Sequence, residues 1–245
     1  MTLNLKLLIM HVLENNGGGK QMKKAFTLAE VLLTLAIIGV IAALTIPAVI
    51  TKVTKGQYVT GLKKAYNTLK TVEGKAREEY GDMESWDWTS GTNPTADFEK
   101  YFLPHFDVLK NCGATTEKGC FADGITELNG ESTGQFNGTS YYKIVTSDGM
   151  FWAYSKIYTV TPLHWRGEFT VDVNGLKGPN RLGRDIFKFH VFPSNLGIKP
   201  YGSYYNDGTT PFSTSTVNAN CNTSYSSSPG WYCAAKVLSE SAMNY

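Results

Sequence analysis

The organisation of this chain is decided by the stretch Phe26-Thr27-Leu28-Ala29-Glu30-Val31-Leu32-Leu33, which opens a long apolar run. Between Glu30 and Lys52 lie 21 residues without a charged side chain. At ~1.5 Å per residue, a helix of that length spans ~30 Å, the thickness of a bilayer's hydrocarbon core. The run therefore predicts a membrane-spanning helix. A buried core helix is the first alternative, but few soluble helices are apolar on every face. A cleaved secretory signal is the second, although its apolar region is usually shorter and ends at a small-x-small site.

Apart from the apolar run, the chain has the composition of a globular protein. The 245 residues are 42% hydrophobic, 13% aromatic and 18% charged, with a mean hydropathy of −0.21. These values allow one domain of moderate size, or two small ones, and exclude a disordered chain. The formal net charge of +2 gives no polybasic signature, so charge indicates no nucleic-acid partner.

The cysteines indicate which side of the membrane the larger part occupies. Cys112, Cys120, Cys221 and Cys233 all follow the apolar run, in two local pairs. Three connectivities are possible, and we favour Cys112–Cys120 and Cys221–Cys233 in an oxidising compartment. Zinc is the alternative, but the chain has no CxxC and its histidines lack ligand spacing. Lysines on the two sides of the run nearly balance, so the cysteines place the N-terminus in the cytoplasm and the rest outside.

The residues around the start of the run, Lys23 to Leu33, carry a family resemblance. A short basic leader followed by Phe26-Thr27-Leu28-Ala29-Glu30 strongly resembles the N-terminus of type IV pilins and type II secretion pseudopilins. The resemblance implies that prepilin peptidase cuts between Ala25 and Phe26 and methylates the new Phe26 amine. The family usually has Gly before the cut; Ala25 is the smallest alternative, so we expect slower cleavage. Pro47 matches a proline often found in the family's membrane segment, and it predicts a kink or local melting near Thr45–Pro47.

The spacing of Phe26 and Glu30 gives this resemblance a physical mechanism. After the cut, the Phe26 amine lies four positions from Glu30. Glu30 of one subunit can then neutralise the amine of its neighbour, removing two unpaired charges from an apolar filament core and fixing the axial register. The alternative is that Glu30 simply lies among lipid headgroups. We expect Thr27 to contribute packing within the assembly.

The chain divides into four segments by pattern. Residues 1–25 form a leader, with Met22 as an alternative start that would leave residues 1–21 untranslated. Residues 26–50 form the transmembrane and assembly helix. Apolar residues at three- and four-residue steps, from Val53 to Tyr80, predict an amphipathic continuation over residues 51–81, which Gly81 ends. Residues 82–245 form an extracytoplasmic head.

The head shows strand signals in its middle. Tyr141–Thr146 and Met150–Tyr154 flank Ser147-Asp148-Gly149, a hairpin pattern, and Glu168–Val173 and Ile186–Phe192 alternate apolar and polar residues. Short helices are expected within residues 82–139, and residues 202–230 read as a disulfide-stapled surface loop. We therefore predict an α+β fold with a small antiparallel sheet packed on the long N-terminal helix, which is also the pilin-like architecture that the resemblance implies.

One loop of the head has the side chains of a calcium site. Asp172, Asn174, Asn180 and Asp185 place four oxygen-bearing side chains among glycines, and hard oxygen ligands suit Ca²⁺. Pseudopilin heads are similar in having a calcium-binding loop near the C-terminus. The alternative is a Gly-Pro-Asn turn in which Asp and Asn cap backbone amides, and the positive charge of Arg181 and Arg184 favours it.

These patterns predict a structural subunit and no enzyme, since no Gly-rich phosphate loop and no HExxH is present. The resemblance implies assembly into a type II secretion pseudopilus or a type IV pilus, and the polar, glycine-rich head favours the pseudopilus. It implies as partners identical or related pilin subunits, prepilin peptidase, an inner-membrane assembly platform and membrane lipid. It implies a single-pass location in the bacterial inner membrane before assembly. The alternatives are an anchored binding module or adhesin using the aromatic-rich segment 201–232, and an anchored enzyme.

Overall fold

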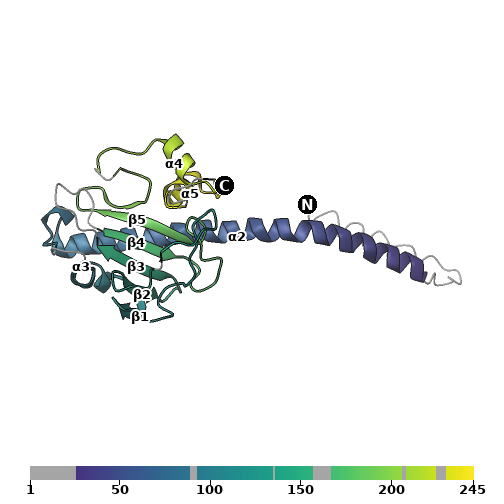
Figure 1. Ribbon diagram of the computed structural model, residues 1–245, viewed down its shortest axis with the longest axis horizontal. Helices are drawn as coiled ribbons and strands as arrows, with labels where there is room; N and C mark the ends of the chain where they lie inside the picture. Colours follow the sequence, from purple (N-terminus) through teal and green to yellow (C-terminus); the bar gives the residue numbers. More distant parts are fainter. Residues whose placement is uncertain (1–25, 89–92, 135, 157–166, 206–207, 225–229) are drawn as a thin grey trace, which may run out of the picture. The chain divides into compact units, whose positions relative to one another are not determined.

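The computed structural model describes residues 26–88, 93–134, 136–156, 167–205, 208–224 and 230–245 (Figure 1). The leader 1–25, with Met22 and the cleavage residue Ala25, lies outside these residues. The chain forms two compact units that divide between Val49 and Ile50. We call them the N-terminal unit and the C-terminal unit.

One helix, α2, runs without interruption from Leu28 to Tyr80 and belongs to both units. Of the two expected effects of Pro47, local melting near Thr45–Pro47 is wrong, because the helix continues through Pro47, while the kink stays a prediction. A proline removes one backbone donor, and the remaining turns of a long helix can hold their geometry around that loss. The Thr45 hydroxyl also donates to the carbonyl oxygen of Ile41 at 2.9 Å, a local bond within the same turns.

In the C-terminal unit, α2 buries one stripe of side chains and exposes the rest. The stripe follows the predicted spacing but begins at Tyr58, because Val53 is 55% exposed. The helix ends where the sequence predicts. Gly81 has φ +74°, in the left-handed region, and its N–H donates to the carbonyl oxygen of Arg77 at 2.9 Å. A glycine at this position closes a helix without a Cβ penalty.

The sheet of the C-terminal unit is a six-stranded antiparallel meander in the order β1-β2-β3-β4-β5-β6. Its strands are β1 (Val108–Gly113), β2 (Tyr142–Thr146), β3 (Phe151–Lys156), β4 (Gly167–Asp172), β5 (Ile186–Phe192) and β6 (Gly197–Pro200). The four predicted strands and the hairpin are confirmed, and β1 and β6 extend the sheet at its two edges. The α+β prediction is confirmed.

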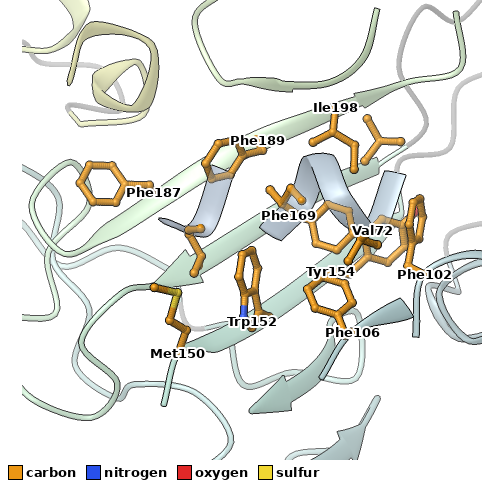
Figure 2. Packing of buried hydrophobic residues seen from close by; sticks show 14 of the residues in the cluster. Val72, Phe102, Phe106, Met150, Trp152, Tyr154, Phe169, Phe187, Phe189 and Ile198 are labelled. Atoms are coloured by element: carbon orange, nitrogen blue, oxygen red, sulfur yellow. The ribbon is translucent and has the colours of Figure 1, made fainter. Parts of the chain in front are cut away.

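An aromatic core joins this sheet to α2. Figure 2 shows Val72 of the helix beside the ring of Phe169 on β4, with Tyr154 and Ile198 nearby. Tyr66 of the helix stacks on Phe189 of β5, with ring centroids 5.8 Å apart. Fully burying one such side chain contributes roughly 1.5–3 kcal/mol. The helix segment from Tyr58 to Ala76 is therefore held to the sheet by its buried face.

Short helices surround the sheet. They are η1 (Met83–Ser85), α3 (Thr95–Tyr101), η2 (Leu103–His105), α4 (Thr214–Asn220) and α5 (Cys233–Glu240). The predicted short helices within residues 82–139 are confirmed by η1, α3 and η2. The predicted loop over residues 202–230 contains a helix, α4, with Ser213 as its N-cap; residues 206–207 and 225–229 of that loop lie outside the described residues.

The second face of the sheet is also covered, which the alternating strands did not predict. A smaller cluster containing Phe121, Phe136 and Leu182 packs there. As a result, the polar residues of that face are buried. Lys188 Nζ lies 2.9 Å from a carboxylate oxygen of Glu168. Burial alone would raise the pKa of Glu168, but Lys188 and a hydrogen bond from a neighbouring histidine lower it to about 2.

Candidate functional site

The start of α2 is closed by a reciprocal pair of hydrogen bonds between Thr27 and Glu30. The Thr27 backbone N–H and hydroxyl each donate to Glu30 Oε2 at 2.9 Å. In return, the Glu30 backbone N–H donates to the Thr27 hydroxyl oxygen at 3.2 Å. Since the helix begins at Leu28, Thr27 is the N-cap and Glu30 the third helical residue. This is a capping box, in which two otherwise unpaired backbone donors are satisfied.

The capping box orients the carboxylate that the sequence singles out for assembly. Both bonds from Thr27 end on Oε2, and no bond to Oε1 is present among the described residues. Oε1 is therefore available to accept from a cation on another molecule. The expected packing role of Thr27 stays a prediction; what the sequence analysis missed is its capping role. The signal was present, because Thr-x-x-Glu before an apolar run is typical of this motif.

The helix that follows the capping box presents apolar side chains on every side within the N-terminal unit. An 18-residue window of α2 has a mean hydropathy of 2.6, and none of it is buried. Among the exposed side chains, Leu28 is 77% exposed and Leu44 is 75% exposed. By length and composition the helix can cross a membrane, and lipid or other apolar helices would cover these surfaces.

Both predicted disulfides are present in the C-terminal unit. The Cα atoms are 6.1 Å apart in Cys112–Cys120 and 4.9 Å apart in Cys221–Cys233. No cysteine among the described residues is free, so no thiolate is left there to bind zinc. The two bridges close local loops, as the sequence spacing predicts.

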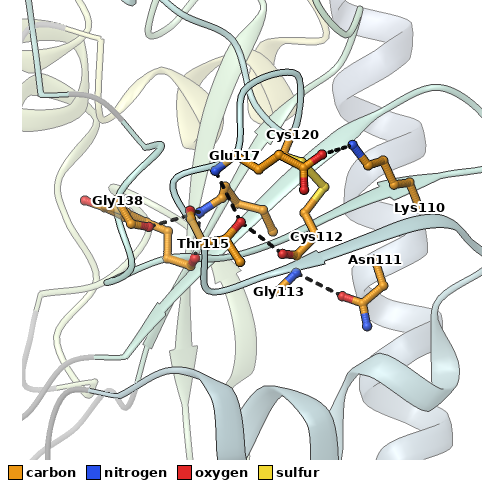
Figure 3. The surroundings of a disulfide bond; sticks show 10 residues. Lys110, Asn111, Cys112, Gly113, Thr115, Glu117, Cys120 and Gly138 are labelled. Atoms are coloured by element: carbon orange, nitrogen blue, oxygen red, sulfur yellow. Dashed lines mark hydrogen bonds and ion pairs between the residues drawn. A yellow bond between two sulfur atoms is a disulfide. The ribbon is translucent and has the colours of Figure 1, made fainter.

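A buried lysine, Lys143, forms hydrogen bonds with the loop that the Cys112–Cys120 disulfide closes. Figure 3 shows the Cys112–Cys120 bridge together with Thr115 and Gly138. Lys143 of β2 is fully buried, and its Nζ donates to the carbonyl oxygens of Thr115 and Gly138 at 2.5 and 3.0 Å. Burial lowers the pKa of Lys143, because the charged form loses hydration.

The four residues of the predicted calcium loop come together in the structure. Asp172 and Asp185 are both fully buried. The two carboxylate oxygens of Asp185 accept from the backbone N–H groups of Arg181 and Asn180 at 2.7 and 2.9 Å. The Asn174 side chain also bonds Asp185. Burial, reinforced by the nearby charge of Asp185, raises the pKa of Asp172 to about 8.

Several oxygens in this loop have no hydrogen-bond partner. Asp172 Oδ2, Asn174 Oδ1 and Asn180 Oδ1 are buried and unpaired among the described residues. Buried polar atoms normally have partners, so three such oxygens in one loop need an explanation. Two carboxylates with two amide oxygens match the hard-oxygen donors that Ca²⁺ takes. No group of three or more His, Cys, Asp or Glu side chains that fits a metal occurs in the described part of the chain. A cation here would therefore rely on amide oxygens as well as carboxylates.

The capped start of α2 and the unit that follows it can now be compared with known protein families. The described residues begin with a capped, apolar helix that is long enough to span a membrane, and they continue into an α+β unit with two disulfides. Residues 20–46 match the family described as the prokaryotic N-terminal methylation motif, which confirms the predicted resemblance for this segment.

The curated relative found by comparison matches over a limited length. The fimbrial protein EcpC of Eikenella corrodens is 36% identical over 67 residues. The match covers 27% of this chain and 41% of that protein, so the chain spans about two-fifths of the length of its curated relative. No solved structure matches the chain significantly.

Proposed function

We propose that this chain is a pilin-like structural subunit that assembles through its N-terminal helix into a filament. The observation that carries the proposal is the start of α2. There, a carboxylate with an available oxygen stands at the head of an apolar helix whose surface no other part of the N-terminal unit covers. A bilayer can cover the apolar surface, but only a cation pairs with the carboxylate inside it.

The proposed sequence of events begins in the bacterial inner membrane, with the N-terminus in the cytoplasm and the C-terminal unit outside. Prepilin peptidase cuts between Ala25 and Phe26 and methylates the new amine, which keeps its positive charge. At an inner-membrane assembly platform, helices exchange lipid contacts for contacts with identical or related subunits. Glu30 Oε1 of one subunit accepts from the Phe26 amine of its neighbour, while Oε2 stays bonded to Thr27.

The experiment that tests this function measures both the mature N-terminal residue and the amount of filament in the same cells. In cells with an active prepilin peptidase, the membrane and sheared fractions should contain a chain that starts at methylated Phe26, measured by mass spectrometry. An intact leader in the membrane fraction of such cells would overturn the proposed processing. Mature subunits that never enter a shearable or cross-linkable filament would overturn the proposed assembly, and would favour an anchored adhesin.

We further propose that the filament is a type II secretion pseudopilus rather than a type IV pilus, and that the loop from Asp172 to Asp185 binds Ca²⁺. The unpaired, buried oxygens support both parts of this proposal. Asp172 and Asp185 would supply the charge, and Asn174 and Asn180 the amide oxygens. Bound Ca²⁺ would offset the repulsion between two carboxylates that burial brings together.

The calcium proposal is tested by ligand linkage on the full chain in detergent. Ca²⁺ at a hundred times its Kd should stabilise the fold by about 2.7 kcal/mol and raise the thermal midpoint above that in chelator. Asp172→Asn should lose this shift. Glu131→Gln, which alters an exposed carboxylate outside the loop, should keep it. Equal midpoints with Ca²⁺ and with chelator would leave the loop as a plain turn.

A further inference from the structure

Charge is segregated along α2 and the segment that follows it. Residues 51–77 carry seven Lys and Arg against one acidic residue. Residues 78–99 carry seven Asp and Glu and no Lys or Arg. Both stretches belong to the C-terminal unit. The net charge of the chain therefore changes from positive to negative within 49 residues, although the whole chain carries only +2. Two surfaces of opposite charge follow one another along the chain.

The basic stretch lines a groove of about 560 Å³, which we call the basic groove. Its wall on α2 includes Lys63, Lys64 and Lys75, and its other wall includes His105 and Asp107. Lys64 pairs with a carboxylate of the β2–β3 turn at 3.0 Å. Lys63 and Lys75 are exposed and form no ion pair with any residue that the structure describes. The Asp107 carboxylate already accepts a hydrogen bond from a serine hydroxyl. Lys63 and Lys75 outnumber the single Asp107 carboxylate, so the groove keeps a net positive charge.

The acidic stretch forms a compact surface at the end of the helix, which we call the acidic turn: Glu78, Glu79, Asp82, Glu84 and Asp87, all exposed. Glu79 lies 3.6 Å from His105, and Asp82 lies 3.2 Å from Arg77. Glu78 and Glu84 form no ion pair within the described part of the chain. The acidic turn thus carries carboxylates in excess of its local cations.

The two surfaces meet only at one end of the groove, where His105 lies 3.6 Å from Glu79. At ~1.5 Å per residue, Lys63 and Glu78 lie ~22 Å apart along α2, more than twice the ~8 Å Debye length at physiological ionic strength. Lys75 is one turn from Glu78, but its amine makes no bond to that carboxylate in the structure. The far end of the groove, at Lys63, therefore has no carboxylate of its own acidic turn within reach, and a second molecule can supply one.

We propose that the basic groove of one copy of this chain receives the acidic turn of a second copy. The inference rests on the proposed filament function and identifies a contact between C-terminal units. The two halves of the contact are different surfaces displaced along one helix axis, so the contact is heterologous. Repetition of a heterologous contact that does not close generates an open polymer. The displacement makes that polymer grow along the axis of α2, in parallel copies.

The test reverses the charges of the basic groove in the full chain and then asks whether reversing the acidic turn as well restores assembly. It uses cells that assemble the wild-type filament. Lys63→Glu combined with Lys75→Glu should reduce the sheared filament at least tenfold, while the amount of mature membrane protein stays unchanged. Adding Glu78→Lys and Glu84→Lys to that variant should restore most of the filament. The control reverses two exposed lysines that do not line the groove, Lys118 and Lys110, of which Lys110 pairs with Glu117 at 2.7 Å, and should assemble normally.

The outcomes separate this contact from the proposed function. The contact is overturned, and the filament function stands, if the variant with Lys63→Glu and Lys75→Glu forms normal filaments. The same conclusion follows if that variant loses its filaments and the added Glu78→Lys and Glu84→Lys do not restore them. A loss as large in the Lys110 and Lys118 control would also overturn it, since charge alone would then explain the defect. No filament from the wild-type chain would overturn the proposed function, and this inference with it.

Discussion

Replacing Glu30 by glutamine or by alanine separates the two roles that the structure gives this side chain. The Thr27–Glu30 hydrogen bonds close the helix start, and Oε1 stands available to a neighbouring amine. Glutamine also serves at this position of a capping box, so Glu30→Gln keeps the cap and removes the charge. Glu30→Ala removes both. A control, Thr27→Ala, removes the cap and keeps the charge.

The expected magnitudes differ enough to distinguish the roles. Loss of an N-cap costs about 1 kcal/mol at the helix start. Loss of one partner of a buried ion pair costs ~3–5 kcal/mol, because the other charge stays uncompensated. At ~1.4 kcal/mol for each tenfold change, this weakens every subunit contact by about a hundredfold or more. We therefore expect Glu30→Gln to fail in assembly nearly as completely as Glu30→Ala, and Thr27→Ala to lose only part of the filament.

The assay compares sheared filament with total mature protein on the same blot. All three variants should insert and be cut, because Lys23 to Phe26 is unchanged, and removal of a charge makes insertion easier. The reasoning is refuted if Glu30→Gln forms filaments like the wild type while Glu30→Ala does not. That pattern would show that the cap, and not the charge, supports assembly.

Three further predictions concern the stability of the C-terminal unit, measured by unfolding of the full chain in detergent. Replacing Cys221 and Cys233 by serine should lower the free energy of unfolding by ~3 kcal/mol, from loop closure over a separation of 12 residues; an unchanged midpoint would contradict this. Gly197→Ala should lower the midpoint clearly, since φ is +64° and a Cβ would lie 1.7 Å from a carboxylate oxygen, whereas Gly74→Ala, in open space on α2, should be neutral or stabilising. Because the pKa of Glu168 is lowered to about 2, its ion pair contributes about 3 kcal/mol above pH ~4.5 that is lost as the pH falls toward 2. Stability of Glu168→Gln should accordingly change less over that pH range, and parallel curves would refute the assignment.

Short sequence patterns correctly predicted the parts of the fold that are determined by the backbone conformation of a few neighbouring residues. The glycine that ends α2 at Tyr80 and the turn between β2 and β3 are determined by backbone conformation, which short sequences encode. The edge strand β1 was missed because Val108–Gly113 includes lysine, asparagine and glycine and shows no strict alternation. Edge strands need less apolar sequence, since only one side pairs.

The second layer over the sheet was missed for a different reason. The alternation in β4 and β5 predicted the strands but not the residues, distant in sequence, that cover the polar face of the sheet. Glu168 and Lys188 are tolerated there because they pair with each other, and a single sequence does not reveal such long-range pairing. At the candidate site, the sequence singled out Glu30 for its charge but not the cap that orients it.

The position of the cap one residue after Phe26 has a consequence for the timing of assembly. While the leader is attached, the nitrogen of Phe26 is an uncharged amide. If the leader is cut as proposed, that nitrogen becomes a cation beside the N-terminal end of α2, where the helix macrodipole is equivalent to about half a positive charge. Like charges then meet at the tip of the subunit, and its own Glu30, already bonded to Thr27, compensates them only in part. Under the proposed processing, removal of the leader would therefore give each subunit an electrostatic reason to polymerise that the precursor lacks.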